Sequence, residues 1–157
     1  MFVSRSAYEP GHPRALAIYC SDGRFTEAVE ELLHHLGHAR LDTLTMPGGP
    51  ALLNPWSASI LDADQIQRAS QFLIRAHAID HIVLLSHENC GYYRQKMPGR
   101  PVVDVREAQA DDLRIAARAV RGARPGVRVV LYHATPHEGH VGFHSISEAP
   151  GGALASS

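Results

Sequence analysis

The sequence has little cysteine and no long apolar run. Cys20 and Cys90 are the only cysteines among 157 residues. The first residues contain no apolar run of signal-peptide length, and no segment approaches the roughly 20 apolar residues that span a bilayer. We therefore expect a soluble, cytoplasmic protein with no membrane partner. In that reducing compartment the two cysteines are expected to be thiols, thiolates or metal ligands rather than a structural disulfide.

The chain also has no excess of charge of one sign. Its formal net charge is -1 and its isoelectric point is near 6.8, although fourteen of the fifteen cationic side chains are arginine. Because this balance provides no strongly basic surface, we expect no nucleic-acid partner. With 45% apolar residues the chain can bury one core, which predicts a single domain over residues 1–148 and a disordered tail over residues 149–157.

Several nucleophilic motifs are missing around the cysteines. A cysteine phosphatase loop places an arginine six positions after the cysteine, but Thr26 occupies that position after Cys20. A thioredoxin-like centre needs C-x-x-C, which the sequence lacks. No G-x-S-x-G elbow, Walker loop or G-x-G-x-x-G motif opens a predicted helix. These absences exclude the common nucleophile and phosphate-binding arrangements.

Short apolar runs alternate with segments of helical periodicity. This alternation predicts an α/β fold with a three-layer, mostly parallel sheet of four strands, with residues 140–148 as a candidate edge strand. We expect Asp64 to cap the second helix, and Thr135-Pro136 to end the fourth strand. The predicted strands are 15–20, 41–46, 81–87 and 127–134, and the predicted helices are 25–36, 64–76 and 102–121.

Three residues with metal-binding side chains lie at predicted strand ends. Cys20 ends the first strand, His87 ends the third, and Cys90 follows within one turn. If these two strands are neighbours, the three side chains converge at the carboxyl edge of the sheet, where α/β proteins bind ligands. Two thiolates and one imidazole leave one tetrahedral position open, which is typical of a catalytic zinc site. The alternative is that both cysteines are small buried apolar residues and that His87 is a core histidine.

The segments CSDGR (20–24) and HENCG (87–91) resemble the zinc-site motifs of the β-class carbonic anhydrases, C-x-D-x-R and H-x-x-C-G. The resemblance implies a β-carbonic-anhydrase-like fold, Zn2+ bound by Cys20, His87 and Cys90, and assembly as a homodimer or higher homo-oligomer. It further implies that Asp22 accepts a hydrogen bond from the zinc-bound water and that Arg24 pairs with Asp22. Alternatively, these two residues cap the helix that begins near Phe25.

The activity implied by the resemblance is the hydration of carbon dioxide to bicarbonate. Zinc lowers the pKa of bound water to about 7, so a zinc-bound hydroxide can form near neutral pH and attack the carbon. The chain departs from the family over residues 46–50, MPGGP, where typical members carry an Arg-Asn-Ala-Gly type of loop. Two alternatives therefore stay open: hydrolysis of another small carbonyl or thiocarbonyl compound, such as carbonyl sulfide or carbon disulfide, and a non-catalytic zinc-binding or ligand-binding relative.

Histidine is abundant, with eleven residues, and four of them cluster near the end of the fourth predicted strand. One member of this cluster could shuttle protons, because an unperturbed imidazole has a pKa of about 6.5. The alternative is that all four are solvated loop residues. Trp56, Tyr92 and Tyr93 are expected to be packing or interface residues. The clustered histidines are His133, His137, His140 and His144.

Overall fold

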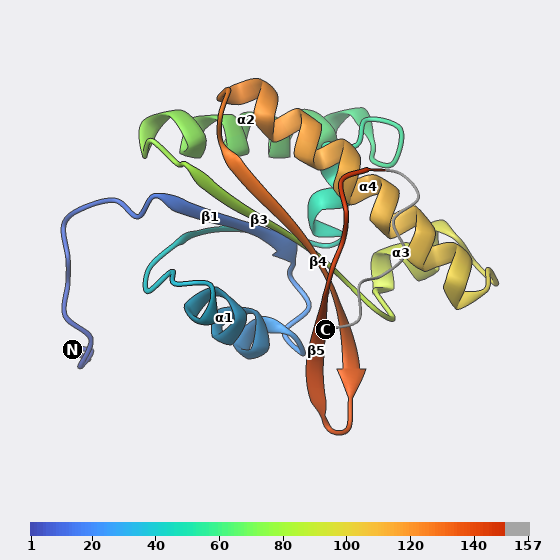
Figure 1. Ribbon diagram of the computed structural model, residues 1–157, viewed down its shortest axis with the longest axis horizontal. Helices are drawn as coiled ribbons and strands as arrows, with labels where there is room; N and C mark the ends of the chain where they lie inside the picture. The colour runs from blue at the N-terminus through green and yellow to red at the C-terminus, as the bar shows by residue number, and fades with distance from the viewer. Residues whose placement is uncertain (150–157) are drawn as a thin grey trace.

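A five-stranded sheet organises the protein, with the strands in the order β2-β1-β3-β4-β5. The computed structural model describes residues 1–149, and Figure 1 shows the sheet with helices on both sides. The first four strands are parallel and β5 is antiparallel to β4, which confirms the predicted α/β class. The elements are β1 (Ala15–Cys20), α1 (Thr26–His35), β2 (Asp42–Met46), η1 (Gly49–Leu53), α2 (Ile60–Ala76), β3 (His81–His87), α3 (Gly91–Lys96), α4 (Val102–Ala123), β4 (Arg128–His137) and β5 (His140–Ser145).

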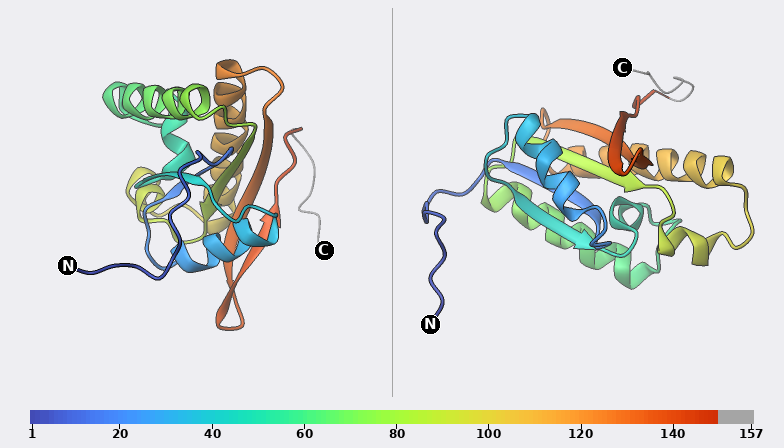
Figure 2. Two further views of the ribbon diagram at one scale, coloured as in Figure 1. Left: turned by 90° about the vertical axis from the view of Figure 1, so that its left-hand side faces the viewer. Right: turned by 90° about the horizontal axis from the view of Figure 1, so that it is seen from below.

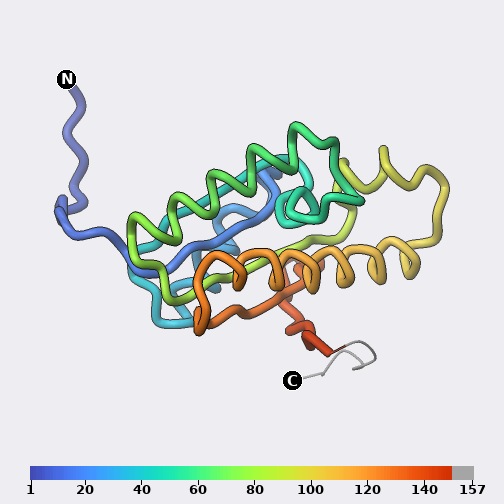
Figure 3. Tube along the Cα trace, turned by 90° about the horizontal axis from the view of Figure 1, so that it is seen from above, coloured from blue at the N-terminus to red at the C-terminus, as the bar shows by residue number. Residues whose placement is uncertain are grey.

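The two faces of the sheet are covered by different helices. Alternate residues of a strand point to opposite faces, and the buried side chains divide accordingly. Leu16 of β1 packs in the larger core with α2, α4 and η1, whereas Ala17 packs in a smaller core with α1. Figure 2 shows α1 on the opposite side of the sheet from α2 and α4, and Figure 3 shows α2 and α4 side by side. The result is the three-layer arrangement that the sequence predicts.

One helix prediction needs correction, and two short helices were missed. Helix α2 begins at Ile60, not near Asp64, because Ser59 is its N-cap and accepts a hydrogen bond from the backbone N–H of Asp62. The 3-10 helix η1 and the short helix α3 were not predicted. Both are too short to show a full apolar period in the sequence.

The fourth strand also continues further than predicted. Strand β4 runs to His137 rather than ending at Thr135-Pro136, and it forms a hairpin with the predicted edge strand β5. Pro136 is tolerated because pairing with β3 stops at Ala134, so the missing N–H of proline removes no bond to that neighbour. Among residues 1–149, no helix is long and apolar enough to cross a membrane. The tail expected to be disordered lies, except for Ala149, outside the described residues.

Candidate metal centre

The carboxyl ends of β1 and β3 bring the three predicted ligands together. The two strands are adjacent and pair in parallel from Ala15 opposite His81. The ligand atoms of Cys20, His87 and Cys90 all lie within 4.8 Å of one another. The two sulfurs are 3.9 Å apart, and both cysteines are free thiols. Such a group could hold a metal ion through two sulfurs and one nitrogen.

The imidazole of His87 is oriented by its surroundings. Its Nδ1 lies 2.9 Å from the backbone carbonyl oxygen of Glu88, which can only accept, so Nδ1 carries the proton and Nε2 carries the lone pair. The ring packs against Phe25, with ring centroids 4.4 Å apart. Gln109 donates a hydrogen bond to the backbone carbonyl of His87 at 2.8 Å. His87 Nε2 is buried without a hydrogen-bond partner among residues 1–149, as expected for an atom that coordinates a metal.

The two thiols differ in acidity. The hydrogen bond between them lowers the pKa of Cys20, and His87 and the backbone N–H groups of Gly48 and Asp22 lower it further. The same hydrogen bond, together with burial, raises the pKa of Cys90. The pair therefore favours one thiolate at Cys20, and a bound cation would be needed to favour a second at Cys90.

Asp22 and Arg24 form an ion pair beside this centre. Arg24 Nη2 lies 2.6 Å from Asp22 Oδ2, and Arg24 Nε lies 2.9 Å from Asp22 Oδ1. Hydrogen bonding to Arg24 lowers the pKa of the Asp22 carboxyl from 3.8 to about 2. The N-cap of α1 is Phe25, and no side-chain hydrogen bond caps that helix among the described residues. Asp22 instead accepts the backbone N–H of Arg24 at 3.2 Å, so the geometry does not support the helix-cap alternative.

The glycines of the loop after β2 pack directly on the centre, a feature that the sequence did not predict. A Cβ on Gly49 would lie 2.6 Å from the backbone nitrogen of Cys20, and one on Gly48 would lie 2.7 Å from the ring of Tyr92. Both glycines have positive φ, at 85° for Gly48 and 52° for Gly49. Only glycine fits this close approach without displacement. The segment that departs from the resembled family thus forms one wall of the centre.

One of the four clustered histidines, His133, is not a solvated loop residue. It lies within β4 and is only 2% exposed, with Nδ1 2.9 Å from the hydroxyl of Ser86. Burial, followed by the nearby Arg106, lowers the pKa of His133 to about 4. The ring is therefore neutral at pH 7. His137 and His140 are exposed on the hairpin, while His144 contacts the hydroxyl of Thr135.

The aromatic residues have different environments. Tyr93 is buried and donates to the carboxylate of Asp112, which also raises the pKa of the phenol beyond the effect of burial. Tyr92 donates to the backbone carbonyl of Ser57 at 2.6 Å. Trp56 is 91% exposed. The two tyrosines are therefore packing residues, whereas nothing in the described chain covers Trp56.

Comparison with known proteins identifies a family and supports the fold. Residues 12–141 match the sequence profile of a family described as "Putative carbonic anhydrase". No curated protein sequence matches the chain significantly.

Among solved structures, the β-carbonic anhydrase CafA of Aspergillus fumigatus is similar with a TM-score of 0.58 and 16% identity, over 88% of this chain and 77% of that one. The β-carbonic anhydrase isoform I from Trichomonas vaginalis has a TM-score of 0.54 and 16% identity, over 89% of this chain and 87% of that one. A tetrameric β-carbonic anhydrase of Sordaria macrospora has a TM-score of 0.55 and 14% identity, over 93% of this chain and 84% of that one. At these identities the structural matches establish the fold alone.

Proposed function

We propose that this chain, which belongs to the carbonic anhydrase family matched by residues 12–141, hydrates carbon dioxide to bicarbonate with a zinc ion bound by Cys20, His87 and Cys90. The observation that carries the proposal is the convergence of two thiols and the unpartnered Nε2 of His87 at one strand edge. This donor set suits zinc and leaves one position for water or substrate. Bound zinc would supply a Lewis acid that lowers the pKa of water.

The residues of the chain itself would orient the reactants. The carbonyl of Glu88 fixes the His87 tautomer, so that Nε2 is available as a ligand. Asp22 would accept a hydrogen bond from the attacking water at a carboxylate oxygen, with Arg24 holding that carboxylate in place. Arg24 also reaches the backbone carbonyl of Asn89 at 3.4 Å, which links the ion pair to the turn carrying Cys90.

The loop of Gly48 and Gly49 keeps a second candidate reaction open. A side chain at Gly49 would meet the backbone of Tyr19 and Cys20, and one at Gly48 would meet the ring of Tyr92. The same donor set could act on another linear triatomic substrate, such as carbonyl sulfide or carbon disulfide. A relative that binds zinc without catalysis would share the ligands and lack activity with all three compounds.

Stopped-flow measurement with zinc-loaded protein separates these functions. We expect pH-indicator kinetics to show carbon dioxide hydration, and Arg24→Ala to retain zinc while the rate falls about tenfold or more, because general acid–base positioning contributes about 10²–10⁴-fold. Arg118→Ala is the matched control, since Arg118 is exposed on α4. Sulfide release from carbonyl sulfide or carbon disulfide without carbon dioxide hydration would replace the proposed reaction. Inactivity with every substrate would favour the non-catalytic relative.

Exposed apolar side chains bear on the assembly of the protein. The Sordaria macrospora relative is tetrameric. Trp56, Ile60 and Leu61 are each at least 80% exposed in this chain and provide apolar surface that a second copy could bury. We propose a homodimer or higher homo-oligomer in the cytoplasm, with residues 1–148 as one domain.

A further inference from the structure

A cavity of about 380 Å³ lies next to the metal centre, on the side of β4 and α4. Its wall includes Cys90, so the cavity reaches the centre, but most of its lining comes from elements that the proposed function does not use. These are the turn after β3, helix α3, the loop that follows it, and the first turns of α4. The lining includes the polar side chains of Glu88, Arg94, Arg100, Arg106 and His133.

Two buried nitrogens in the cavity wall have no partner. His133 Nε2 and Arg106 Nε are both buried and form no hydrogen bond among residues 1–149. Arg106 Nε–H can only donate. Nδ1 of His133 is the acceptor that lies 2.9 Å from the Ser86 hydroxyl, and when that hydroxyl donates to it, Nε2 carries the proton and is a donor. Since buried donors are almost always paired, the wall lacks an acceptor with at least two lone pairs.

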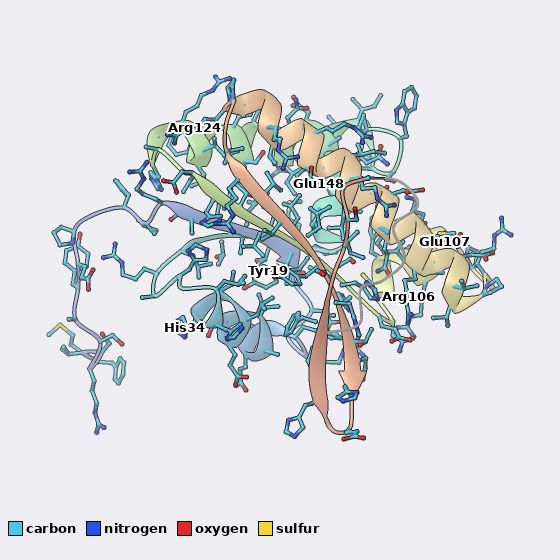
Figure 4. The ribbon with its side chains drawn as sticks, viewed as in Figure 1. Tyr19, His34, Arg106, Glu107, Arg124 and Glu148 are labelled. Carbon is cyan, nitrogen blue, oxygen red and sulfur yellow. The ribbon has the colours of Figure 1, made fainter. Side chains whose placement is uncertain are left out.

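The charge of the lining favours an anionic acceptor. Arg94, Arg100 and Arg106 contribute three cations, against the single carboxylate of Glu88. Glu88 lies 3.7 Å from Nη2 of Arg106, which leaves the Nε of that arginine unused. In Figure 4, Arg106 lies on the side of α4 that faces β4 and the hairpin. A hydrogen bond from arginine to a planar carboxylate is stronger than one to a neutral acceptor.

The rest of the wall is apolar. Met97, Val102 and Val105 line the cavity together with Pro98. Bicarbonate has no apolar part to cover these side chains, and the volume exceeds that of a triatomic substrate several times. An apolar cavity with a few convergent polar groups is the usual form of a site for an organic ligand.

We propose that this cavity binds a small organic carboxylate, with the carboxylate accepting hydrogen bonds from Arg106 Nε and His133 Nε2 and the apolar body lying against Met97, Val102 and Val105. Cys90 is the one proposed metal ligand that lines this cavity, and carboxylate binding does not require the proposed activity. Because Cys90 belongs to both the cavity and the metal centre, a bound carboxylate would lie beside the metal centre and could modulate it. A pair of ordered waters on the same nitrogens is the competing occupant.

Benzoate is a suitable probe, with benzamide as its uncharged counterpart. We expect calorimetry on zinc-loaded protein to show benzoate binding at least tenfold tighter than benzamide, because hydrogen bonds to a charged group are about twice as strong as neutral ones. Arg106→Gln and His133→Phe should each weaken benzoate by about tenfold, since each removes one charge-assisted bond. Arg118→Gln, on the same helix, should leave the affinity unchanged.

A second pair of variants avoids buried positions. Val102 lines the cavity and its neighbour Val103 does not, and both side chains are at least half exposed. Glutamate is favourable in the first turn of a helix, so Val102→Glu and Val103→Glu should both fold. We expect Val102→Glu to weaken benzoate about fivefold by repulsion and Val103→Glu to have little effect.

Cobalt substitution shows where the probe binds. Benzoate in the proposed cavity should leave the metal-ligand absorption bands of cobalt-loaded protein close to those of the free protein. If benzoate shifts those absorption bands, and if Val102→Glu and Val103→Glu bind benzoate with equal affinity, then benzoate coordinates the metal. That result would overturn the proposal. So would a crystal structure with only waters on His133 Nε2 and Arg106 Nε at saturating benzoate.

Discussion

Replacing Gly49 by alanine tests whether the loop after β2 supports the metal centre. The added Cβ would lie 2.6 Å from both the backbone nitrogen of Cys20 and the carbonyl carbon of Tyr19. These are backbone atoms of a central strand, so neither can rotate away as a side chain could. Either the loop leaves β1, or the end of β1 moves and carries Cys20 with it.

The expected cost has two parts. Alanine at a φ of 52° costs about 1–2 kcal/mol of backbone free energy. Overpacking against immobile atoms adds about 1–3 kcal/mol. Gly126→Ala is the matched control, because Gly126 has a φ of 83° and a Cβ there meets nothing within 4 Å. Gly126→Ala should show only the backbone cost. The free energies of unfolding of the two variants should therefore differ by about 1–3 kcal/mol.

Denaturant unfolding of the metal-free proteins measures this difference without a contribution from bound zinc. A difference of that size corresponds to roughly 2–12 °C in Tm for a chain of this length. Zinc content after dialysis then reports on the site itself, and we expect Gly49→Ala to retain less zinc than Gly126→Ala. Equal stability and equal zinc content in the two variants would show that the loop does not position Cys20.

Two further predictions concern the ligands and the assembly. We expect the parent protein to bind about one zinc ion per chain, and Cys20→Ser, His87→Ala and Cys90→Ser each to lose most of it. Acidification should release the zinc, because both thiols must be deprotonated to bind it. Full zinc content in all three variants by atomic absorption would refute the site. Light scattering at micromolar concentration should show a dimer or larger species, and Trp56→Glu should shift it toward monomer, whereas a monomeric parent protein would contradict the assembly.

The sequence predicts the ligand convergence because that convergence depends on a general property of parallel sheets. Strand ends are readable from apolar runs, and neighbouring parallel strands end at the same edge. The prediction that Cys20 and His87 lie close together therefore required only that β1 and β3 be neighbours, which the strand order confirms. The Asp22–Arg24 pair was implied by the family motif, and the structure shows it as a bidentate contact.

The cavity beside Cys90 could not be predicted in the same way. It depends on α3, which is too short for helical periodicity, and on His133, which is buried within β4 although the sequence left open that it is a solvated loop residue. The missing signal was alternation: Leu131, His133 and Thr135 face one side of β4 and are all buried. Extending the apolar period by two residues would have placed His133 inside the protein.

The role of Arg24 follows from comparing two pKa values with the working pH. The Asp22 carboxyl has a pKa of about 2 beside Arg24 and 3.8 without a partner, so it is ionised at pH 7 in either case. Because the folded value is the lower one, the stabilisation that it gives the protein is present above pH 3.8 and disappears as the pH falls through about 2. Zinc loss near neutral or mildly acidic pH would therefore come from thiol protonation and not from this pair. At neutral pH the contacts of Arg24 with both carboxylate oxygens hold the Asp22 side chain in one orientation. Arg24→Ala should accordingly lower the rate across the neutral pH range without moving the pH midpoint of zinc release, and a variant that changed only that midpoint would show that charge, rather than orientation, is what Arg24 supplies.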